Sequence, residues 1–200
     1  TATFGGNVGG AGLTINGAGG TLNLGPDYTH TFTGPVTLSS GTLNGNSSTL
    51  NINFAGTAWT GTGSNFVAGS STVKFGGAAQ TLATATTFNN LTFAGTGTKT
   101  LTGVPTVNGI LSMEGTATVS AAPTYGTSAA LQYNRTAAQA SGPEWITPFV
   151  ASGGVSIIGA GVVTANAIKS FNATASLNIG SGATLANGGF AISGSSTLNV

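Results

Sequence analysis

Short runs in which apolar and polar residues alternate make up most of this chain, and turn-forming residues separate the runs. The pattern is most regular between Thr72 and Tyr125. There the runs read TVKF, QTLA and TTFNN, then LTFA, KTLTG and PTVNG, and finally ILSM, ATVS and APTY. A period of two that breaks at Gly, Ala, Pro and Asn is typical of short β-strands joined by tight turns. The pattern therefore predicts repeating units of three short strands each.

The units also repeat at a spacing of about nineteen residues. A shift of this size places Gly76 on Gly95, Thr81 on Thr100, Leu82 on Leu101, Thr87 on Thr106, Phe88 on Val107, Asn89 on Asn108 and Leu91 on Ile110. A unit this small cannot bury its own apolar side, whereas parallel stacking about 4.8 Å apart gives successive units a shared interior. We therefore predict an all-β fold, a right-handed parallel β-helix (β-solenoid) with coils of about 18–23 residues and three short strands each.

This prediction assigns specific side chains to the interior. We expect Val73, Phe75, Leu82 and Phe88 to point inward, and we expect Phe75, Phe93 and Met113 to lie on one sheet. Each such side chain contributes roughly 1.5–3 kcal/mol when it is fully buried. Ordering about twenty residues costs at least as much. A single coil is therefore unstable, and cohesion has to come from neighbouring coils.

Alternation continues on both sides of the clearest repeat, with less regular turns. It is present in TLNL, THTF, VTL, TLN and TLNINF, and again in VSII, VVTA, SLNI, ATL, FAIS and TLNV. Residues 1–20 contain eight glycines, and LTI is their one clear strand, so we expect a loosely ordered first segment. We interpret residues 1–200 as one solenoid domain, either a segment of a longer protein or a protomer of a fibre.

The alternation weakens after LQYN at residues 131–134. The next residues, RTAAQASGPEWITP, include two prolines, which cannot donate to a strand ladder. We therefore predict an irregular loop near residues 135–149. Aromatic residues and arginine are common interface anchors, so Tyr133, Arg135, Glu144 and Trp145 form a candidate interface. The alternative is that Trp145 covers a flank of the rod.

The last strand is a second candidate interface. Thr197, Leu198, Asn199 and Val200 form an alternating run with no obvious cap after it. Unpaired backbone groups of such a strand can pair with the first coil of another copy. Head-to-tail contacts of this kind do not close, so they give filaments.

Charged residues form 4% of the chain, against about 25% in ordinary soluble domains. The four basic residues, Lys74, Lys99, Arg135 and Lys169, are scattered, and the net charge is +1. This distribution argues against nucleic acid as a partner. Cysteine is absent. The least polar run, residues 153–168, is too short and too rich in polar residues for insertion into a membrane.

Catalysis needs titratable groups close together, and the chain offers few. Its acids are Asp27, Glu114 and Glu144, and His30 is the single histidine. Asp27 and His30 could be half of a triad, but we expect His30 to be an exposed strand residue. Glu114 and Glu144 could be a glycosidase pair, yet their separate contexts give no reason for them to meet. We therefore predict no enzyme activity, no cofactor and no metal site.

Threonine pairs at T-x-T spacing suggest one further alternative, an ice-binding solenoid. They occur at Thr29 and Thr31, Thr84 and Thr86, Thr98 and Thr100, and Thr116 and Thr118. Ice binding requires such pairs at one position in every coil, whereas these pairs shift phase between turns. Ordinary β-propensity explains the threonines equally well.

Three long phrases resemble repeats of very large secreted bacterial surface proteins: FNNLTFAGTGTKTLTGVPTVNGILSM, LQYNRTAAQASGPEW and SLNIGSGATLANGGFAISGSSTLNV. They are similar to the passenger regions of autotransporter adhesins and of filamentous haemagglutinin, which are right-handed parallel β-helices. The resemblance implies an extracellular protein of the bacterial cell surface, and it transfers no catalytic residue. We expect a structural, non-enzymatic stalk or self-assembling fibre. The alternative is an adhesin module that binds a host or surface glycan or protein through residues 133–149.

Overall fold

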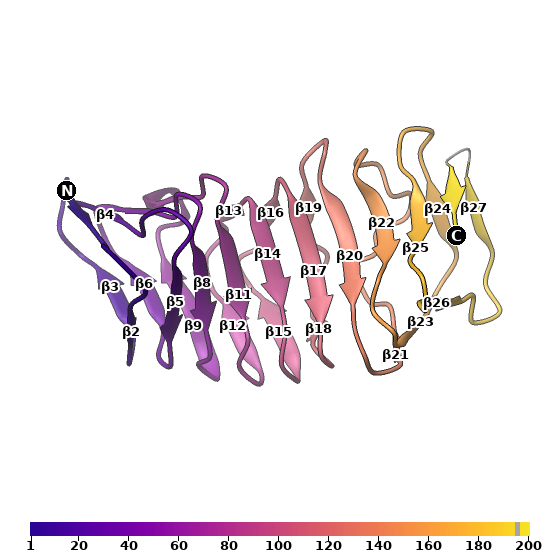
Figure 1. The fold of residues 1–200 in the computed structure, drawn as a ribbon, viewed down its shortest axis with the longest axis horizontal. Helices are drawn as coiled ribbons and strands as arrows, with labels where there is room; N and C mark the ends of the chain where they lie inside the picture. The colour runs from indigo at the N-terminus through magenta and orange to yellow at the C-terminus, as the bar shows by residue number, and fades with distance from the viewer. Residues whose placement is uncertain (195–196) are drawn as a thin grey trace.

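The computed structural model describes residues 1–194 and 197–200. The chain winds through about nine turns of a β-solenoid in which every sheet is parallel. Figure 1 shows the coils side by side along the long axis, from the N-terminus at one end to the C-terminus at the other. The predicted parallel β-solenoid with three short strands per coil is confirmed.

One side of the rod is a single ten-stranded sheet, which we call the front sheet; it faces the viewer in Figure 1. Its strands, in spatial order, are β2 (Gly9–Gly10), β5 (Thr29–Phe32), β8 (Thr49–Ile52), β11 (Thr72–Phe75), β14 (Asn90–Phe93), β17 (Ile110–Glu114), β20 (Ala130–Asn134), β22 (Gly154–Ile157), β25 (Leu177–Ile179) and β28 (Leu198–Asn199). Because spatial order follows sequence order, each coil adds one strand to this sheet.

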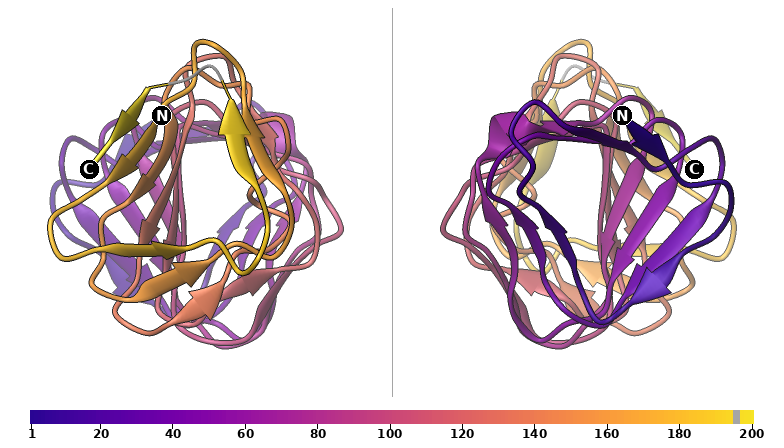
Figure 2. Two further views of the ribbon diagram at one scale, coloured as in Figure 1. Left: turned by 90° about the vertical axis from the view of Figure 1, so that its right-hand side faces the viewer. Right: turned by 90° about the vertical axis from the view of Figure 1, so that its left-hand side faces the viewer.

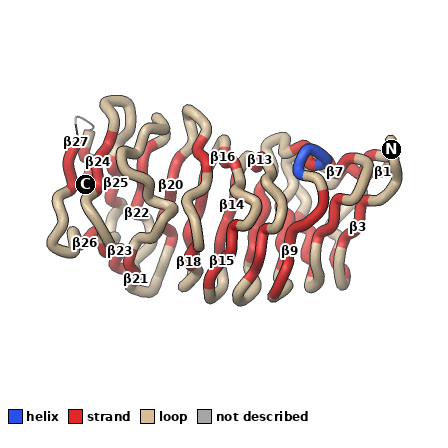
Figure 3. The backbone as a smooth tube through the Cα atoms, turned by 180° about the vertical axis from the view of Figure 1, so that it is seen from behind, coloured by secondary structure: helices blue, strands red, loops and turns tan. Residues whose placement is uncertain are grey.

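The other two sides consist of shorter sheets. Figure 2 shows the three-sided stack from its two ends, and Figure 3 shows the rod from behind. The second side contains β3 (Leu13–Ile15), β6 (Val36–Leu38), β9 (Gly56–Gly61), β12 (Gln80–Leu82), β15 (Thr98–Leu101) and β18 (Thr118–Val119), followed by β21 (Gln139–Ala140), β23 (Val162–Thr164) and β26 (Thr184–Ala186). The third contains β1 (Ala2–Thr3), β4 (Thr21–Asn23), β7 (Thr42–Asn44), β10 (Phe66–Val67), β13 (Thr87–Phe88), β16 (Thr106–Val107), β19 (Thr124–Tyr125), β24 (Lys169–Phe171) and β27 (Ile192–Gly194). One 3-10 turn, η1 (Gly63–Asn65), interrupts the strands.

Between the first two coils of the clearest repeat, the nineteen-residue shift is correct on the two shorter sides. Thr81 pairs with Thr100 and Leu82 with Leu101, and on the third side Phe88 pairs with Val107. On the front sheet the shift is wrong by one residue, because Leu91 pairs with Leu111 rather than with Ile110. The corner before β17 contains one more residue than the corner before β14. Paired front-sheet residues are separated by 18 positions at Thr72 and Asn90 and by 24 at Ala130 and Gly154, so corners absorb the variation in coil length.

One corner of the repeat requires glycine. Gly95 and Gly115 have φ angles of 69° and 57°, in the left-handed region that favours glycine. A Cβ atom on Gly95 would lie 2.3 Å from the carbonyl oxygen of Gly76 in the preceding coil. The match of Gly76 with Gly95 in the sequence therefore reflects close contact between backbones of adjacent coils.

Two continuous columns of inward side chains follow the front sheet. One consists of His30, Leu50, Val73, Leu91, Leu111, Leu131, Val155, Leu177 and Leu198; the other consists of Phe32, Ile52, Phe75, Phe93, Met113, Tyr133, Ile157 and Ile179. The predicted inward positions of Val73, Phe75, Leu82 and Phe88 are confirmed, since all four are buried. The predicted stacking of Phe75, Phe93 and Met113 is confirmed as well.

Aromatic rings fill the interior beside these columns. The Trp59 ring centroid lies 5.3 Å from that of Phe66, 5.4 Å from that of Phe88 and 6.2 Å from that of Phe75. Trp59 Nε1 donates a hydrogen bond to Thr86 Oγ1 at 2.9 Å. Edge-to-face aromatic pairs add to the stabilisation from area burial, so this cluster anchors the regular coils.

Two segments are more regular than the sequence predicted. Residues 1–20 form a coil with the strands β1, β2 and β3, although we expected a loosely ordered segment. Backbone pairing needs no side chains, so the glycines at Gly9–Gly10 can still form a ladder with β5. In the 135–149 segment, β21 pairs with β23 and Phe149 bridges to Phe171. The irregular part is therefore confined between these two points, and the segment remains part of the coil wall.

Candidate functional site

Most charged side chains of this protein lie inside the rod. Lys99, Arg135, Glu144 and Lys169 are each no more than 3% exposed. The three other charged residues, Asp27, Lys74 and Glu114, reach solvent. Burial of a charge is costly unless partners surround it. The buried groups and their partners are therefore the first place to look for chemistry.

The predicted interface at residues 133–145 is interior. Tyr133, Arg135, Glu144 and Trp145 are 0%, 1%, 1% and 2% exposed. These side chains therefore do not form a surface on which a partner could dock, and Trp145 lies within the core rather than over a flank. The alternation explains why Tyr133 and Arg135 are buried. With Leu131, they occupy every second position of one run, and all three side chains point inward.

Glu144 is the centre of this interior cluster. Its Oε1 accepts hydrogen bonds at 2.8 Å from the Tyr133 hydroxyl and from the backbone N–H of Gly142. Its backbone carbonyl accepts a third, also at 2.8 Å, from the Tyr125 hydroxyl. Burial, assisted by the negative charge of Glu144, raises the pKa of both Tyr125 and Tyr133 well above the ordinary value. Both phenols therefore remain protonated donors.

Two cations complete the cluster. The guanidinium of Arg135 lies 5.6 Å from the Tyr133 ring centroid, and it donates to the carbonyl of Ala117 at 2.8 Å and to the side chain of Gln139. Lys169 Nζ lies 5.4 Å from the Trp145 ring centroid and donates to the Trp145 carbonyl at 2.9 Å. Burial lowers the pKa of Arg135 and of Lys169, and the Glu144 carboxylate opposes both shifts.

This arrangement joins successive coils. Its hydrogen bonds link residues from Ala117 to Lys169 across several coils. Three of its polar atoms, Arg135 Nε, Glu144 Oε2 and Trp145 Nε1, are buried without a partner among the described residues. The Glu144 carboxylate is enclosed, and its hydrogen bonds hold β20 and the turn at Gly142 together.

Lys99 is buried elsewhere, on the second side of the rod. Its Nζ donates to the carbonyl oxygens of Gly77 and Ala78 at 2.6 and 2.7 Å and to Gln80 Oε1 at 2.9 Å. These acceptors belong to the preceding coil, so the ammonium group fastens the corner between β11 and β12. Burial lowers the pKa of Lys99 to about 8.

His30 is also buried, although we expected it to be exposed. Its Nδ1 accepts a hydrogen bond from the backbone N–H of Val8 at 3.1 Å, and its Nε2 donates to the carbonyl of Leu24 at 2.8 Å. A backbone N–H can only donate and a carbonyl can only accept, so both bonds require the neutral tautomer with the proton on Nε2. Both ring nitrogens have backbone partners, and Asp27 is exposed, so the pair forms no part of a triad.

Glu114 and Glu144 lie on opposite sides of the coil wall, as their separate sequence contexts indicated. Glu114 is on the exterior of β17, where Lys74 Nζ donates to its Oε2 at 2.7 Å. The T-x-T pairs also fail to share one position. Thr29 and Thr31 lie on the front sheet, whereas Thr98 and Thr100 lie on the second side. The single threonine array that ice binding requires is therefore not formed by these pairs.

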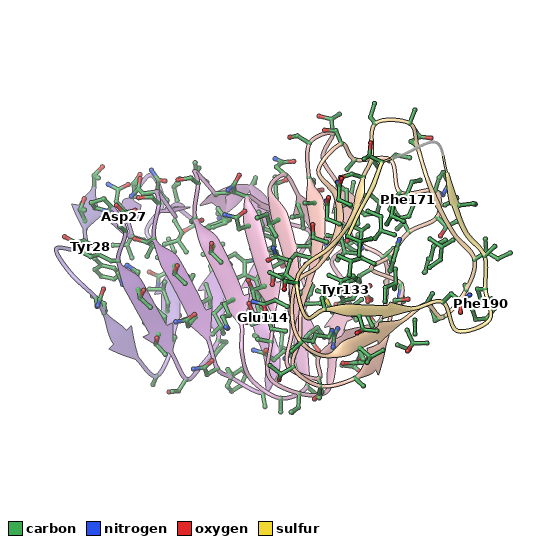
Figure 4. All side chains as sticks on the ribbon, turned by 45° about the vertical axis from the view of Figure 1, so that its right-hand side comes forward. Asp27, Tyr28, Glu114, Tyr133, Phe171 and Phe190 are labelled. Carbon is green, nitrogen blue, oxygen red and sulfur yellow. The ribbon has the colours of Figure 1, made fainter. Side chains whose placement is uncertain are left out.

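The second predicted interface is on the surface. β28 is the terminal strand of the front sheet, and it pairs with β25 along one edge. Leu198 is 61% exposed and Val200 is 94% exposed, while Thr197 and Asn199 also face solvent. Figure 4 shows Phe190 at this same end of the rod.

Other classes of site were sought in the described part of the chain. Residues 1–194 and 197–200 contain no group of three or more His, Cys, Asp or Glu side chains arranged to hold a metal ion. The same residues contain no helix long and apolar enough to cross a membrane. Comparison with protein-family models, with curated proteins and with solved structures finds no match to this chain.

Proposed function

We propose that this chain is a non-enzymatic structural rod of the bacterial cell surface, which serves as an extracellular stalk or as the protomer of a fibre. One observation supports the proposal most: a single parallel sheet follows the whole rod, with one strand from each coil. Such a fold gains length by adding coils and needs no new interior. The enclosed positions of Glu144 and His30 fit a structural role. The resemblance to repeats of secreted bacterial surface proteins gives the proposed location.

The fibre version depends on the two ends of the described sheet. β28 at one end and β2 at the other each have one edge without a partner among the described residues. Backbone pairing of β28 with β2 of a second copy would continue the front sheet across the junction. A second copy of the chain is therefore the partner that we propose for the fibre.

Electron microscopy of the purified chain over a range of concentrations tests whether the chain is a rod and whether it assembles into fibres. We expect filaments at high concentration and their loss in Leu198→Lys, which places a charge at the junction. Thr106→Lys, on the side of the rod at β16, is the matched control and should leave filaments intact. Single rods of uniform length at every concentration would reject the fibre and leave the stalk. Compact particles with no rod shape would reject both.

A further inference from the structure

The outer surface of the front sheet contains a shallow groove with a volume of about 190 Å³. It lies near the middle of the rod, over β11, β14, β17 and β20. Thr92 and Ser112 form its floor and are 6% and 7% exposed. Asn90, Ile110, Glu114 and Gln132 also line it. Typical pockets for drug-sized ligands are about 300–1,000 Å³, so this groove suits a smaller unit of a longer ligand.

The ion pair of Lys74 and Glu114 distinguishes this groove from the rest of the exterior. Asp27, the other charged side chain that reaches solvent, lies near the N-terminal end, whereas Glu114 lies mid-rod (Figure 4). Ser112 Oγ donates to Glu114 Oε1 at 3.3 Å, while Lys74 Nζ holds Oε2. The two charges balance, so the groove is polar and close to neutral.

The remaining groove residues combine donors, acceptors and an apolar patch. Asn90 Oδ1 accepts from the backbone N–H of Ile110 at 3.0 Å, which leaves its Nδ2 group available as a donor. Gln132 makes no side-chain hydrogen bond within the described residues, so its amide can both donate and accept. Ile110 is 40% exposed and supplies apolar area beside these groups.

We propose that this groove binds a neutral oligosaccharide that lies across β14, β17 and β20. Sugar hydroxyls both donate and accept hydrogen bonds, and the C–H faces of sugar rings pack on apolar surface, so a saccharide matches both parts of the groove. An anionic glycan would find no unpaired cation, because Lys74 is paired with Glu114. A peptide strand would find no backbone partner, because all four strands are paired on both edges.

Two measurements test the proposal. The 200-residue chain is applied to an array of immobilised neutral and anionic glycans, and the best soluble trisaccharide is then titrated into it and followed by NMR. We expect a neutral glycan with a dissociation constant between about 1 μM and 1 mM. Its largest amide shifts should fall in β14, β17 and β20. Gln132→Ala and Asn90→Ala should each weaken binding about 3- to 10-fold.

Asn178→Ala is the matched control, because Asn178 is an outward amide on the same sheet, in β25 and outside the groove. It should leave the dissociation constant unchanged. Gln132 has no side-chain hydrogen-bond partner among the described residues, so Gln132→Ala should keep the fold, and an NMR spectrum unchanged outside β14, β17 and β20 verifies this. Absence of binding to every neutral glycan, binding of anionic glycans alone, or equal weakening by Asn178→Ala would overturn the proposal. These outcomes would not affect the structural rod.

Discussion

The regular coils of residues 72–125 and the coils of residues 131–171 hold together by different means. In the first, stacked aliphatic side chains and the rings of Phe75, Phe88 and Phe93 fill most of the interior. In the second, the Glu144 carboxylate, the cations of Arg135 and Lys169 and the Tyr133 phenol lie in the interior beside the rings of Trp145 and Phe171. Both regions nevertheless keep the same backbone ladder. The comparison teaches that the solenoid needs filled inward positions and accepts polar side chains there when they have partners.

The largest effect should come from the regular coils. Phe75→Ala removes a ring that packs against Trp59, Phe88 and Phe93, and it leaves a cavity between adjacent coils. We expect a loss of about 3–5 kcal/mol in the free energy of unfolding, measured by denaturant titration. Thr81→Ala, on the exterior of β12, is the control and should change it by less than about 0.5 kcal/mol. Equal losses in the two variants would contradict the interior position of Phe75.

The polar coil should be nearly as sensitive at its centre. Glu144→Ala leaves the Tyr133 hydroxyl and the Gly142 N–H without their acceptor and leaves Arg135 and Lys169 without a counter-charge. We expect a loss of about 3 kcal/mol in the free energy of unfolding, because removal of Glu144 leaves the other buried polar groups without a partner. A neutral outcome in the same titration would show that the cluster does not hold these coils together.

A smaller, pH-dependent effect is expected at Lys99, the buried cation of the regular coils. Lys99→Met removes the donor to the Gly77 and Ala78 carbonyls, at a cost of about 1–3 kcal/mol near neutral pH. The pKa of Lys99 is lowered to about 8 in the folded chain, against an ordinary 10.5. Between these values the unfolded chain holds more protons, so the contribution of Lys99 to stability rises with pH.

Denaturant titrations at pH 7.5 and pH 9.5 give the free energy of unfolding of the wild type and of Lys99→Met. The difference between the two proteins should be larger at pH 9.5. Lys74→Met, at the surface, is the control and should show the pH dependence of the wild type. Identical pH dependence in the wild type and Lys99→Met would contradict the assignment to Lys99.

The smallest effect is expected at the surface ion pair. Glu114→Ala breaks the contact with Lys74, whose side chain is 38% exposed. Pairs of this kind contribute about 0–1 kcal/mol, so the free energy of unfolding should barely change. The contrast with Glu144→Ala is the sharpest comparison of exterior and interior carboxylates in this chain. A loss as large as that of Glu144→Ala would mean that the exterior pair is structurally essential.

The alternation predicted more of the fold than residue polarity did. It gave the solenoid, the three strands per coil and the inward positions of Val73 and Phe75. The same rule applied to THTF places His30 beside Phe32 in the interior, and applied to LQYNR it places Arg135 there. We expected His30 outside and treated Arg135 as the start of a loop, because we let polarity decide. Period two decides which way a strand residue points, whatever its charge.

Other features were beyond reach of the sequence. The burial of Glu144 and Trp145 depends on the path of an irregular turn, which no period describes. The groove depends on which residues meet across coils, and coil lengths vary with the corners. Lys74 and Glu114 are 40 positions apart: the ladder leads from Lys74 through Thr92 to Ser112, and Glu114 is the next outward residue along β17, within reach of the lysine side chain. Two shifts of nineteen residues also lead from Lys74 to Ser112, but the repeat does not show that the lysine side chain reaches diagonally to Glu114.

The chain has no cysteine, so single cysteines report directly on which positions face the solvent. The most direct test of the account is the rate of thiol labelling under native conditions at residues 98–101 and 131–135. The account predicts fast labelling at Thr98, Thr100 and Asn134, and strong protection at Lys99, Leu101, Tyr133 and Arg135. Labelling of cysteine at Lys99 and Arg135 as fast as at Thr98 would contradict it, because charged side chains would then face outward and the strands would not stack as described.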